Sequence, residues 1–278
     1  MQCYFNGQII PQADASLQLN DLALLRGFGI FDYFVFQRFQ ARFLEDYLDR
    51  FFRSASHLGL QCPVDRDGLR RGIHQLIAAN EVPEGGIRMV LTGGYTPDGF
   101  TPVAGNLFLL QAKFPTYPEQ MFTAGSRVAT YQHQRELPTV KSLNYLTGIY
   151  LLPWLRENNA DFVVYHDGKH LRESDRSNFF IVDNNGTLIT PKEKVLAGIT
   201  RMKILDIARD SGIIVEEREV KLEELQDAAE AFLTSSTKGA LPVTVIDGKA
   251  VGNGQVGAIT KQLQAAFLAL VNRELQPA

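Results

Sequence analysis

The sequence predicts a mixed α/β fold, and three observations lead to that class. Strand-like and helix-like segments alternate along the 278 residues, 45% of the residues are hydrophobic, and a proline-containing stretch at residues 115–118 interrupts the pattern. The hydrophobic share is sufficient for a substantial core, and two prolines disfavour both helix and central strand. We therefore predict two domains, a smaller one over residues 1–118 and a larger one over residues 119–278.

The first domain is predicted to combine strands and helices. Asn6-Gly7 lies between apolar pairs and predicts a hairpin turn. Residues 30–43 are rich in Phe, Tyr and Val, which predicts two strands joined around residues 39–40. Between residues 44 and 60 apolar side chains recur every three or four positions, as in an amphipathic helix. We also expect a helix over residues 67–80 and strands over residues 87–92 and 106–113.

The second domain is predicted to mix strands and helices in irregular order. We expect helices over residues 143–157, 199–211, 222–229 and 257–272. We expect strands over residues 127–131, 162–165, 178–182, 188–189, 213–220, 231–234 and 243–246. Asn185-Gly186 predicts a tight turn between two of these strands.

The composition excludes several classes of protein. A net charge of −3 provides no basic surface for nucleic acid and no polybasic patch for a membrane. No apolar run approaches the roughly 20 residues of a membrane-spanning helix, and residues 1–10 lack the features of a signal peptide. Cys3 and Cys62 form no disulfide framework, and the five histidines have no metal-ligand spacing. We therefore expect a soluble, cytoplasmic protein without a metal site.

Four segments of the second half carry polar residues next to expected strands or helices. They are residues 140–145 (VKSLNY), 171–180 (LRESDRSNFF), 196–201 (LAGITR) and 232–243 (FLTSSTKGALPV). The first places Lys141 directly before an expected helix, and the third opens a helix whose N–H groups suit an anion. Each segment alone also has an ordinary interpretation, as a surface lysine, a solvated loop, a helix cap or a Ser/Thr-rich turn.

Together and in this order, the four segments resemble the class IV aminotransferase family, which has the fold called type IV. Residues 44–51 (LEDYLDRF) extend the resemblance, with Tyr47 where the family usually has histidine. The resemblance implies two α/β domains, a barrel-like mixed sheet in the larger one, and pyridoxal 5′-phosphate bound between them. It also implies a homodimer.

The resemblance further implies a role for individual residues. Lys141 would form the Schiff base with the cofactor and move a proton during the reaction. Glu173 would keep the pyridine nitrogen protonated, and Asn178 would support the loop that carries Glu173. Tyr145 would lie near the cofactor's 3′ oxygen. The residues that would bind the phosphate are Arg50, Ile199, Thr200, Ser236 and Thr237.

The substrate site is predicted from departures from the family's common patterns. Residues 26–33 (RGFGIFDY) have an arginine where branched-chain enzymes have a tyrosine, and the loop after residue 92 lacks the R-x-H of well-known D-amino-acid transaminases. We predict that three arginines, Arg26, Arg88 and Arg176, bind the carboxylate of the substrate instead. Phe31 and Tyr33 are predicted to belong to the same substrate site. The structural alternative is that Arg26 and Arg88 pair with acids such as Asp32.

The predicted reaction transfers an amino group between a D-amino acid, such as D-glutamate or D-alanine, and a 2-oxo acid, such as pyruvate or 2-oxoglutarate. The partners are therefore small molecules. A branched-chain L-amino-acid transaminase and a 4-amino-4-deoxychorismate lyase remain alternatives within the family. A homologue without turnover is a third, but the presence of both Lys141 and Glu173 disfavours it.

Overall fold

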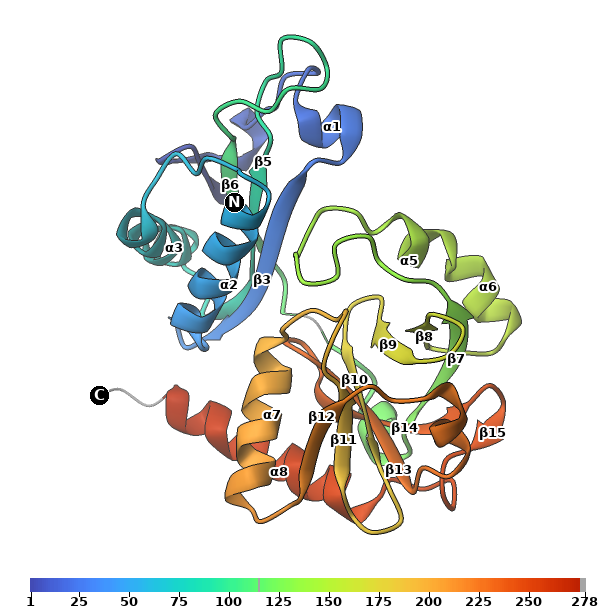
Figure 1. Cartoon of the computed structure of the whole chain (residues 1–278). Coiled ribbons are helices and arrows are strands. Elements are labelled where there is room, and N and C mark those ends of the chain that lie inside the picture. Colours follow the sequence, from blue (N-terminus) through green and yellow to red (C-terminus); the bar gives the residue numbers. More distant parts are fainter. Residues whose placement is uncertain (115, 276–278) are drawn as a thin grey trace. The chain divides into compact units, whose positions relative to one another are not determined.

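The computed structural model describes residues 1–114 and 116–275, which form two compact units (Figure 1). The first unit is Met1–Pro115 with Val140–Asn144 and Glu274–Ala278, and the second is Thr116–Thr139 with Tyr145–Arg273. Both units are discontinuous in sequence, whereas the sequence pattern predicted one division at residue 118. Pro115, which belongs to the predicted linker, lies outside the described residues.

The first unit contains one sheet with the strand order β2-β1-β6-β5-β3-β4. Its strands are β1 (Gln2–Phe5), β2 (Gln8–Pro11), β3 (Gly29–Gln37), β4 (Gln40–Ala41), β5 (Glu84–Thr92) and β6 (Leu107–Ala112). Its helices are η1 (Gln12–Asp14), α1 (Leu22–Arg26), α2 (Leu44–His57) and α3 (Arg66–Asn80). The predicted hairpin turn is confirmed, since Asn6 and Gly7 join β1 to β2 with positive φ angles of 46° and 98°.

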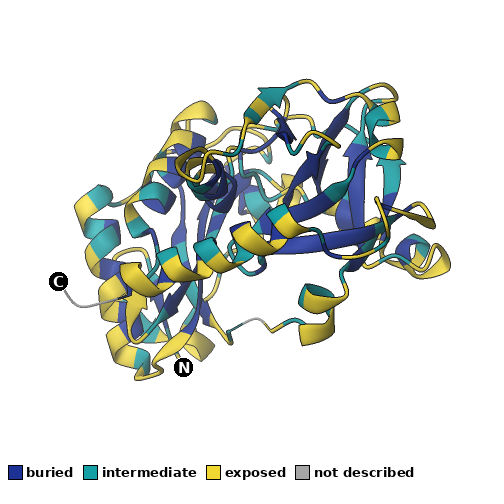
Figure 2. Cartoon of the chain, turned by 90° about the horizontal axis from the view of Figure 1, so that it is seen from below, coloured by how far each residue is buried: buried dark blue, intermediate teal, exposed yellow. Residues whose placement is uncertain are grey.

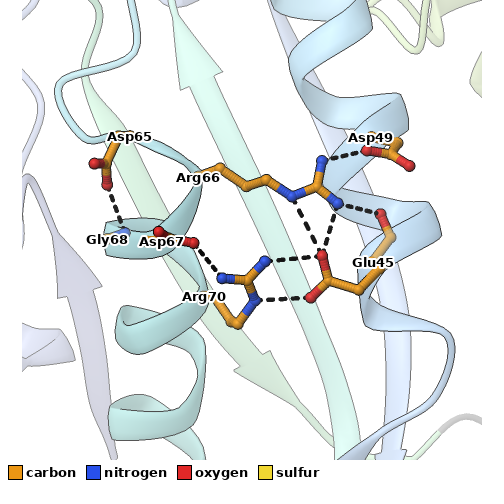
Figure 3. A network of polar contacts seen from close by, with 7 residues as sticks. All are labelled: Glu45, Asp49, Asp65, Arg66, Asp67, Gly68 and Arg70. Atoms are coloured by element: carbon orange, nitrogen blue, oxygen red, sulfur yellow. Dashed lines mark hydrogen bonds and ion pairs between the residues drawn. The ribbon is translucent and has the colours of Figure 1, made fainter.

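Helices α2 and α3 bury one apolar face each on this sheet. Helix α2 packs on β3, and α3 packs on β1, β2 and β6. Their outer faces are joined by an exposed ionic network around Glu45, whose carboxylate accepts from Arg66 Nη2 and Arg70 Nε at 2.7 Å each (Figure 3). Hydrogen bonds from Arg70 and then Arg66 lower the pKa of Glu45 to about 2.

The second unit contains a curled mixed sheet with the order β12-β11-β10-β13-β14-β7-β8-β9, and β15 pairs with β14. Its strands are β7 (Ser126–Gln132), β8 (Phe162–His166), β9 (Leu171–Ser174), β10 (Asn178–Val182), β11 (Leu188–Pro191), β12 (Val215–Arg218), β13 (Glu230–Ser235), β14 (Gly239–Ile246) and β15 (Lys249–Ala250). Its helices are α4 (Glu119–Thr123), α5 (Leu146–Tyr150), α6 (Leu152–Glu157), α7 (Ile199–Asp210), η2 (Leu222–Gln226) and α8 (Ala258–Glu274). The predicted mixed α/β class is confirmed.

The two faces of this sheet have different neighbours. One face carries the main apolar core, to which β10 contributes Phe179 and Ile181 and β13 contributes Ala231 and Leu233. On the other face Phe180 stacks on Phe232, its directly opposite partner, with ring centroids 4.8 Å apart. Because side chains alternate along a strand, Asn178 and Thr234, also opposite each other, share this second face. Figure 2 shows the strands mostly buried and the outer helix faces exposed.

The helix predicted over residues 143–157 is wrong in its first turn and in its continuity. Two short helices, α5 and α6, occupy residues 146–150 and 152–157. Val140–Asn144, which precede α5, belong to the first unit, where Ser142 forms an isolated β-bridge with Ile30. That pairing requires an extended backbone, so Lys141 does not stand at a helix start.

Among the described residues, none of the helices combines the length and hydropathy needed to cross a bilayer.

Candidate active site

The backbone around Lys141 is held on two sides within the first unit. Phe31 N donates to Lys141 O at 2.9 Å, and Leu143 N donates to Gly29 O at 3.0 Å. Lys141 N lies 3.4 Å from Ser54 Oγ of α2. The Lys141 ammonium is 4.5 Å from the centroid of the Phe31 ring, a cation–π distance. These contacts fix the direction in which the lysine side chain leaves the backbone.

Phe31, Tyr33 and Arg88 share one face of the first sheet. Tyr33 is directly opposite Arg88 in the ladder between β3 and β5, and Phe31 is two residues from Tyr33. A Cβ at Gly86 would lie 1.8 Å from Tyr33 Oη, so the tyrosine ring can lie over residue 86 only because that residue is glycine. The structure therefore brings three predicted substrate residues to the face where Lys141 contacts Phe31.

Asp32 points to the other face and pairs with Arg50 of α2. Arg50 Nε donates to Asp32 Oδ2 at 2.9 Å, and Arg50 Nη2 donates to Oδ1 at 2.6 Å. Both side chains are buried. The structural alternative in which Asp32 pairs with Arg26 or Arg88 is therefore wrong: Asp32 is engaged by Arg50, and it lies on the sheet face opposite to Arg88. Asp32 orients Arg50, the residue predicted to bind phosphate.

Glu173 lies on β9 in the second unit and is buried. Its Oε1 accepts from Arg135 Nη1 at 2.9 Å, and its Oε2 accepts from the Leu196 backbone N–H at 2.9 Å and from Asn178 Nδ2 at 3.3 Å. These donors stabilise the negative charge of the carboxylate. Asn178 was expected to support the loop that carries Glu173, and in the structure it contacts the Glu173 carboxylate itself, whereas Arg135 was missed. Its only signal in the sequence is its position on the polar stretch before Lys141.

The N-terminus of α7 is buried and, among the described residues, has no side-chain cap. Gly198 is the N-cap residue, and Ile199 and Thr200 are 6% and 4% exposed. A Cβ at Gly198 would lie 2.0 Å from Asn178 Oδ1, so this approach requires glycine. Helix N-terminal N–H groups need acceptors, and an anion is a natural one. The location of Ile199 and Thr200 thus fits the phosphate of the implied cofactor.

The turn between β13 and β14 presents hydroxyl groups in the same unit. Thr237 Oγ1 lies 3.3 Å from both Ser235 Oγ and Tyr117 Oη. Thr234 Oγ1 is buried and has no hydrogen-bond partner in the part of the chain that the structure describes. A buried hydroxyl without a partner is costly, and a bound anion would satisfy it. This orphaned hydroxyl is a second observation that fits a phosphate group here.

The remaining predicted residues are partly exposed. Arg26 ends α1, and its Nη1 donates to Leu25 O at 3.1 Å. Arg176 pairs with Asp175 through a 3.0 Å contact from Nε to Oδ2. Partial burial lowers the pKa of Arg176, but Asp175 outweighs it, so the pKa is raised. Tyr145, the N-cap residue of α5, also raises the pKa of Arg176, which places Tyr145 in the surroundings of that arginine.

Lys238 is a functional candidate that the sequence pattern did not predict. It is 4% exposed on the turn between β13 and β14, and Nζ donates to Ser177 Oγ at 3.1 Å. Burial, reinforced by Arg176, lowers the pKa of Lys238 to about 8, although Asp175 opposes the shift. A lysine directly after four hydroxyl residues was the available signal.

Comparison with known proteins places this arrangement in a family. The model of the family described as amino-transferase class IV matches residues 29–246. A D-alanine aminotransferase of Listeria monocytogenes serotype 1/2a is 30% identical over 98% of this chain and 97% of the relative. A putative branched-chain-amino-acid aminotransferase of Methanocaldococcus jannaschii is 31% identical over 96% of this chain and 95% of the relative.

A solved structure agrees in fold. The branched-chain amino acid aminotransferase from Escherichia coli superposes with a TM-score of 0.89 at 24% identity, covering 99% of this chain and 95% of that chain. The chain belongs to the class IV aminotransferase family.

Proposed function

We propose that this protein is a pyridoxal-phosphate-dependent transaminase that exchanges an amino group between a D-amino acid and a 2-oxo acid. The observation that carries the proposal is the environment of Glu173, a buried carboxylate held by Arg135, Asn178 and a backbone N–H. Such a group suits a protonated ring nitrogen. The D-alanine aminotransferases among its relatives support the choice of D-amino acids.

The cofactor's phosphate is assigned to three kinds of donor. Ile199 and Thr200 supply the N–H groups of a buried helix N-terminus, and Ser236 and Thr237 supply hydroxyls. Arg50 supplies a guanidinium that Asp32 holds in one orientation. Tyr145 is assigned to the cofactor's 3′ oxygen. Among the described residues, the N-terminus of α7 has no side-chain cap and the buried Thr234 hydroxyl has no hydrogen-bond partner. Both observations support a phosphate group at this part of the second unit.

The proton chemistry is assigned to Lys141 and Glu173. When bound, pyridoxal phosphate supplies an electron-withdrawing ring that stabilises negative charge developing at the substrate Cα. Lys141 would hold the cofactor covalently in the resting enzyme. Once the substrate amine has displaced it, the free amine of Lys141 would move a proton from the substrate Cα to the cofactor C4′. Glu173 keeps the ring nitrogen protonated, which requires the carboxylate to remain anionic, and its three donors favour that state.

The substrate is assigned to the arginine-rich set. Arg88 lies opposite Tyr33, and Phe31 is two residues from Tyr33, so the side chains of Phe31, Tyr33 and Arg88 share one sheet face. Phe31 also contacts Lys141. A guanidinium there offers two parallel hydrogen bonds to a carboxylate. We assign Arg26 and Arg176 to the same task. The set suits dicarboxylic partners such as D-glutamate and 2-oxoglutarate, as well as D-alanine and pyruvate.

A branched-chain L-amino-acid transaminase is the second candidate. The Methanocaldococcus relative, at 31% identity, carries that description, and the Escherichia coli structure shares the fold. An aminodeoxychorismate lyase is a further alternative in the same family. It would release pyruvate without any amino acceptor, which the transaminases would not.

The test is a half-reaction on the purified enzyme loaded with pyridoxal phosphate. D-glutamate, D-alanine and L-leucine are added separately without oxo acid, and the visible absorption of the lysine-bound cofactor is followed. Loss of the band with D-amino acids alone supports the proposal. Loss with L-leucine alone refutes it in favour of the branched-chain function, and a Lys141→Ala variant without the band tests the assignment of that lysine.

We also propose that the protein is a cytoplasmic homodimer with small-molecule partners. Its membership in the family supports the dimer, and the net charge of −3 disfavours a nucleic-acid or membrane partner. Light scattering coupled to size-exclusion chromatography at several protein concentrations measures the mass directly. A monomeric mass at all concentrations would contradict the dimer.

A further inference from the structure

Lys238 is a buried cation without a counter-charge in hydrogen-bonding contact among the described residues. Its ammonium lies 4.6 Å from the centroid of Phe162 and 5.3 Å from that of Tyr117, and its side-chain hydrogen bond goes to Ser177 Oγ at 3.1 Å. An ammonium has three N–H donors, and none of these three neighbours is a carboxylate. Within residues 1–114 and 116–275, Lys238 therefore lacks an ion pair.

Packing alone does not account for a lysine at this position. Phe162 belongs to the main apolar core of the second unit, and Tyr117 packs against that core. A methionine would fill the same space against these rings without placing a charge in an apolar surrounding. Burial disfavours the charged form of Lys238, as the lowered pKa shows. A charge retained at such a site points to a task for the charge itself.

The hydrogen bond to Ser177 connects Lys238 to the turn between β9 and β10. That turn is closed by the Ser174 N–H, which donates to Ser177 O at 2.8 Å. Ser177 stands between Arg176, assigned above to the substrate, and Asn178, which bonds to Glu173. Lys238 thus fixes the turn that carries both residues.

The charges around this turn do not cancel. Arg176 and Asp175 pair with each other through a 3.0 Å contact, and both act electrostatically on Lys238. Two cations and one anion leave one net positive charge. Lys238 is buried, so its charge is weakly screened and attracts an anion, whereas the side chain of Arg176 is 56% exposed and its charge is screened more by solvent. An amino acid with a second carboxylate is the substrate class that would gain from it.

We propose that Lys238 is a specificity-determining residue that favours dicarboxylic over monocarboxylic substrates. It acts in two ways, by holding the Arg176 turn through Ser177 and by adding its positive charge to that of Arg176. The inference rests on the proposed D-amino-acid transamination and names the substrate class that this reaction prefers. Lys238 is a positioning residue, since it acts on Arg176 through Ser177, the next residue of the same turn.

The experiment compares two amino donors in the same holoenzyme preparation. The kcat/KM for D-glutamate is divided by that for D-alanine, each with pyruvate as acceptor. Effects on cofactor binding or on the proton transfer are common to both donors and cancel in this ratio. Lys238→Met should lower the ratio about tenfold, the size of one lost interaction with a charged group.

Three further variants separate the charge from the hydrogen bond. Lys238→Arg keeps the charge and should retain the wild-type ratio. Ser177→Ala keeps the ammonium but removes its acceptor, and should lower the ratio by less than Lys238→Met does. Lys249→Met removes an exposed lysine of β15 and serves as the matched control. Equal losses for both donors in Lys238→Met, or an unchanged ratio, would overturn the proposal.

The pH dependence gives an answer even if Lys238→Met fails to fold. The groups facing Lys238 are Asp175, Arg176 and Tyr117. The wild-type ratio should fall as pH rises through about 8, and Lys238→Arg should abolish that fall. A ratio independent of pH in both proteins contradicts the proposal. No turnover of D-alanine by the wild type would instead refute the proposed function.

Discussion

Replacing Asp32 with asparagine should destabilise the first unit strongly. Asp32 is fully buried and holds Arg50 by two charge-assisted hydrogen bonds of 2.9 and 2.6 Å. Asparagine has the same size and keeps one acceptor oxygen, but it removes the negative charge. The Arg50 guanidinium then stays buried and loses the negative charge that Asp32 supplies, and breaking a buried pair from one side costs about 3–5 kcal/mol.

The loss is measured by thermal and denaturant unfolding of the cofactor-free protein. A change of this size corresponds to a fall in Tm of about 10 °C. Asp49→Asn, on the helix α2 that carries Arg50, is the matched control, because Asp49 is exposed and bonds to Arg66 in the network between α2 and α3 (Figure 3). An exposed pair of that kind contributes at most about 1 kcal/mol.

Pyridoxal phosphate should reduce the loss of stability caused by Asp32→Asn. If Arg50 binds the phosphate as proposed, the dianion supplies a new counter-charge and the variant gains more from the cofactor than the wild type does. A destabilisation below about 1 kcal/mol would refute the argument about the buried pair. An equal gain from the cofactor in both proteins would refute the assignment of Arg50.

Arg88→Leu should raise the KM for 2-oxoglutarate about tenfold or more, since a lost hydrogen bond to a charged group costs about 1.5–3 kcal/mol. An unchanged KM would exclude Arg88 from the substrate site. Gly198→Ala should weaken binding of pyridoxal phosphate, measured by equilibrium titration, because the added Cβ would lie 2.0 Å from Asn178 Oδ1; wild-type affinity would contradict the close approach. Glu45→Gln should lower stability slightly at neutral pH. Since bonding to Arg70 depresses the folded-state pKa of Glu45 to about 2, this contribution should fade as pH falls from about 4.5 to about 2, whereas a pH-independent difference would contradict it.

Elements with a strong local signal were predictable from the sequence. The apolar period of residues 44–60 predicted α2, and Asn6-Gly7 predicted the first hairpin, because both depend on residues close together in the chain. The conformation of Lys141 was not predictable in this way. It is set by pairing with β3 and by Ser54, which are distant in sequence, and this tertiary context overrides the apolar pattern that suggested a helix.

The candidate site was predictable to the extent that its residues lie within recognisable segments. Ile199 and Thr200 open α7 as expected, and Asn178, expected to support the loop that carries Glu173, contacts Glu173 itself. Arg135 and Lys238 were missed because their importance comes from burial and from partners distant in sequence, Glu173 and Ser177. The pairing of Asp32 with Arg50 was missed for the same reason, since an acid in a strand pattern does not reveal which face it occupies.

The interleaving of the two units along the chain constrains how the protein can be made and altered. The chain passes from the first unit to the second near residue 116, returns at Val140–Asn144, and ends in the first unit from Glu274. A fragment that stops at residue 118 would lack the strand-like segment that pairs with Ile30 and carries Lys141. During synthesis on the ribosome, the first unit therefore cannot be completed until the rest of the chain has been made. Exchange of either unit between relatives by a single genetic crossover would separate segments that fold together.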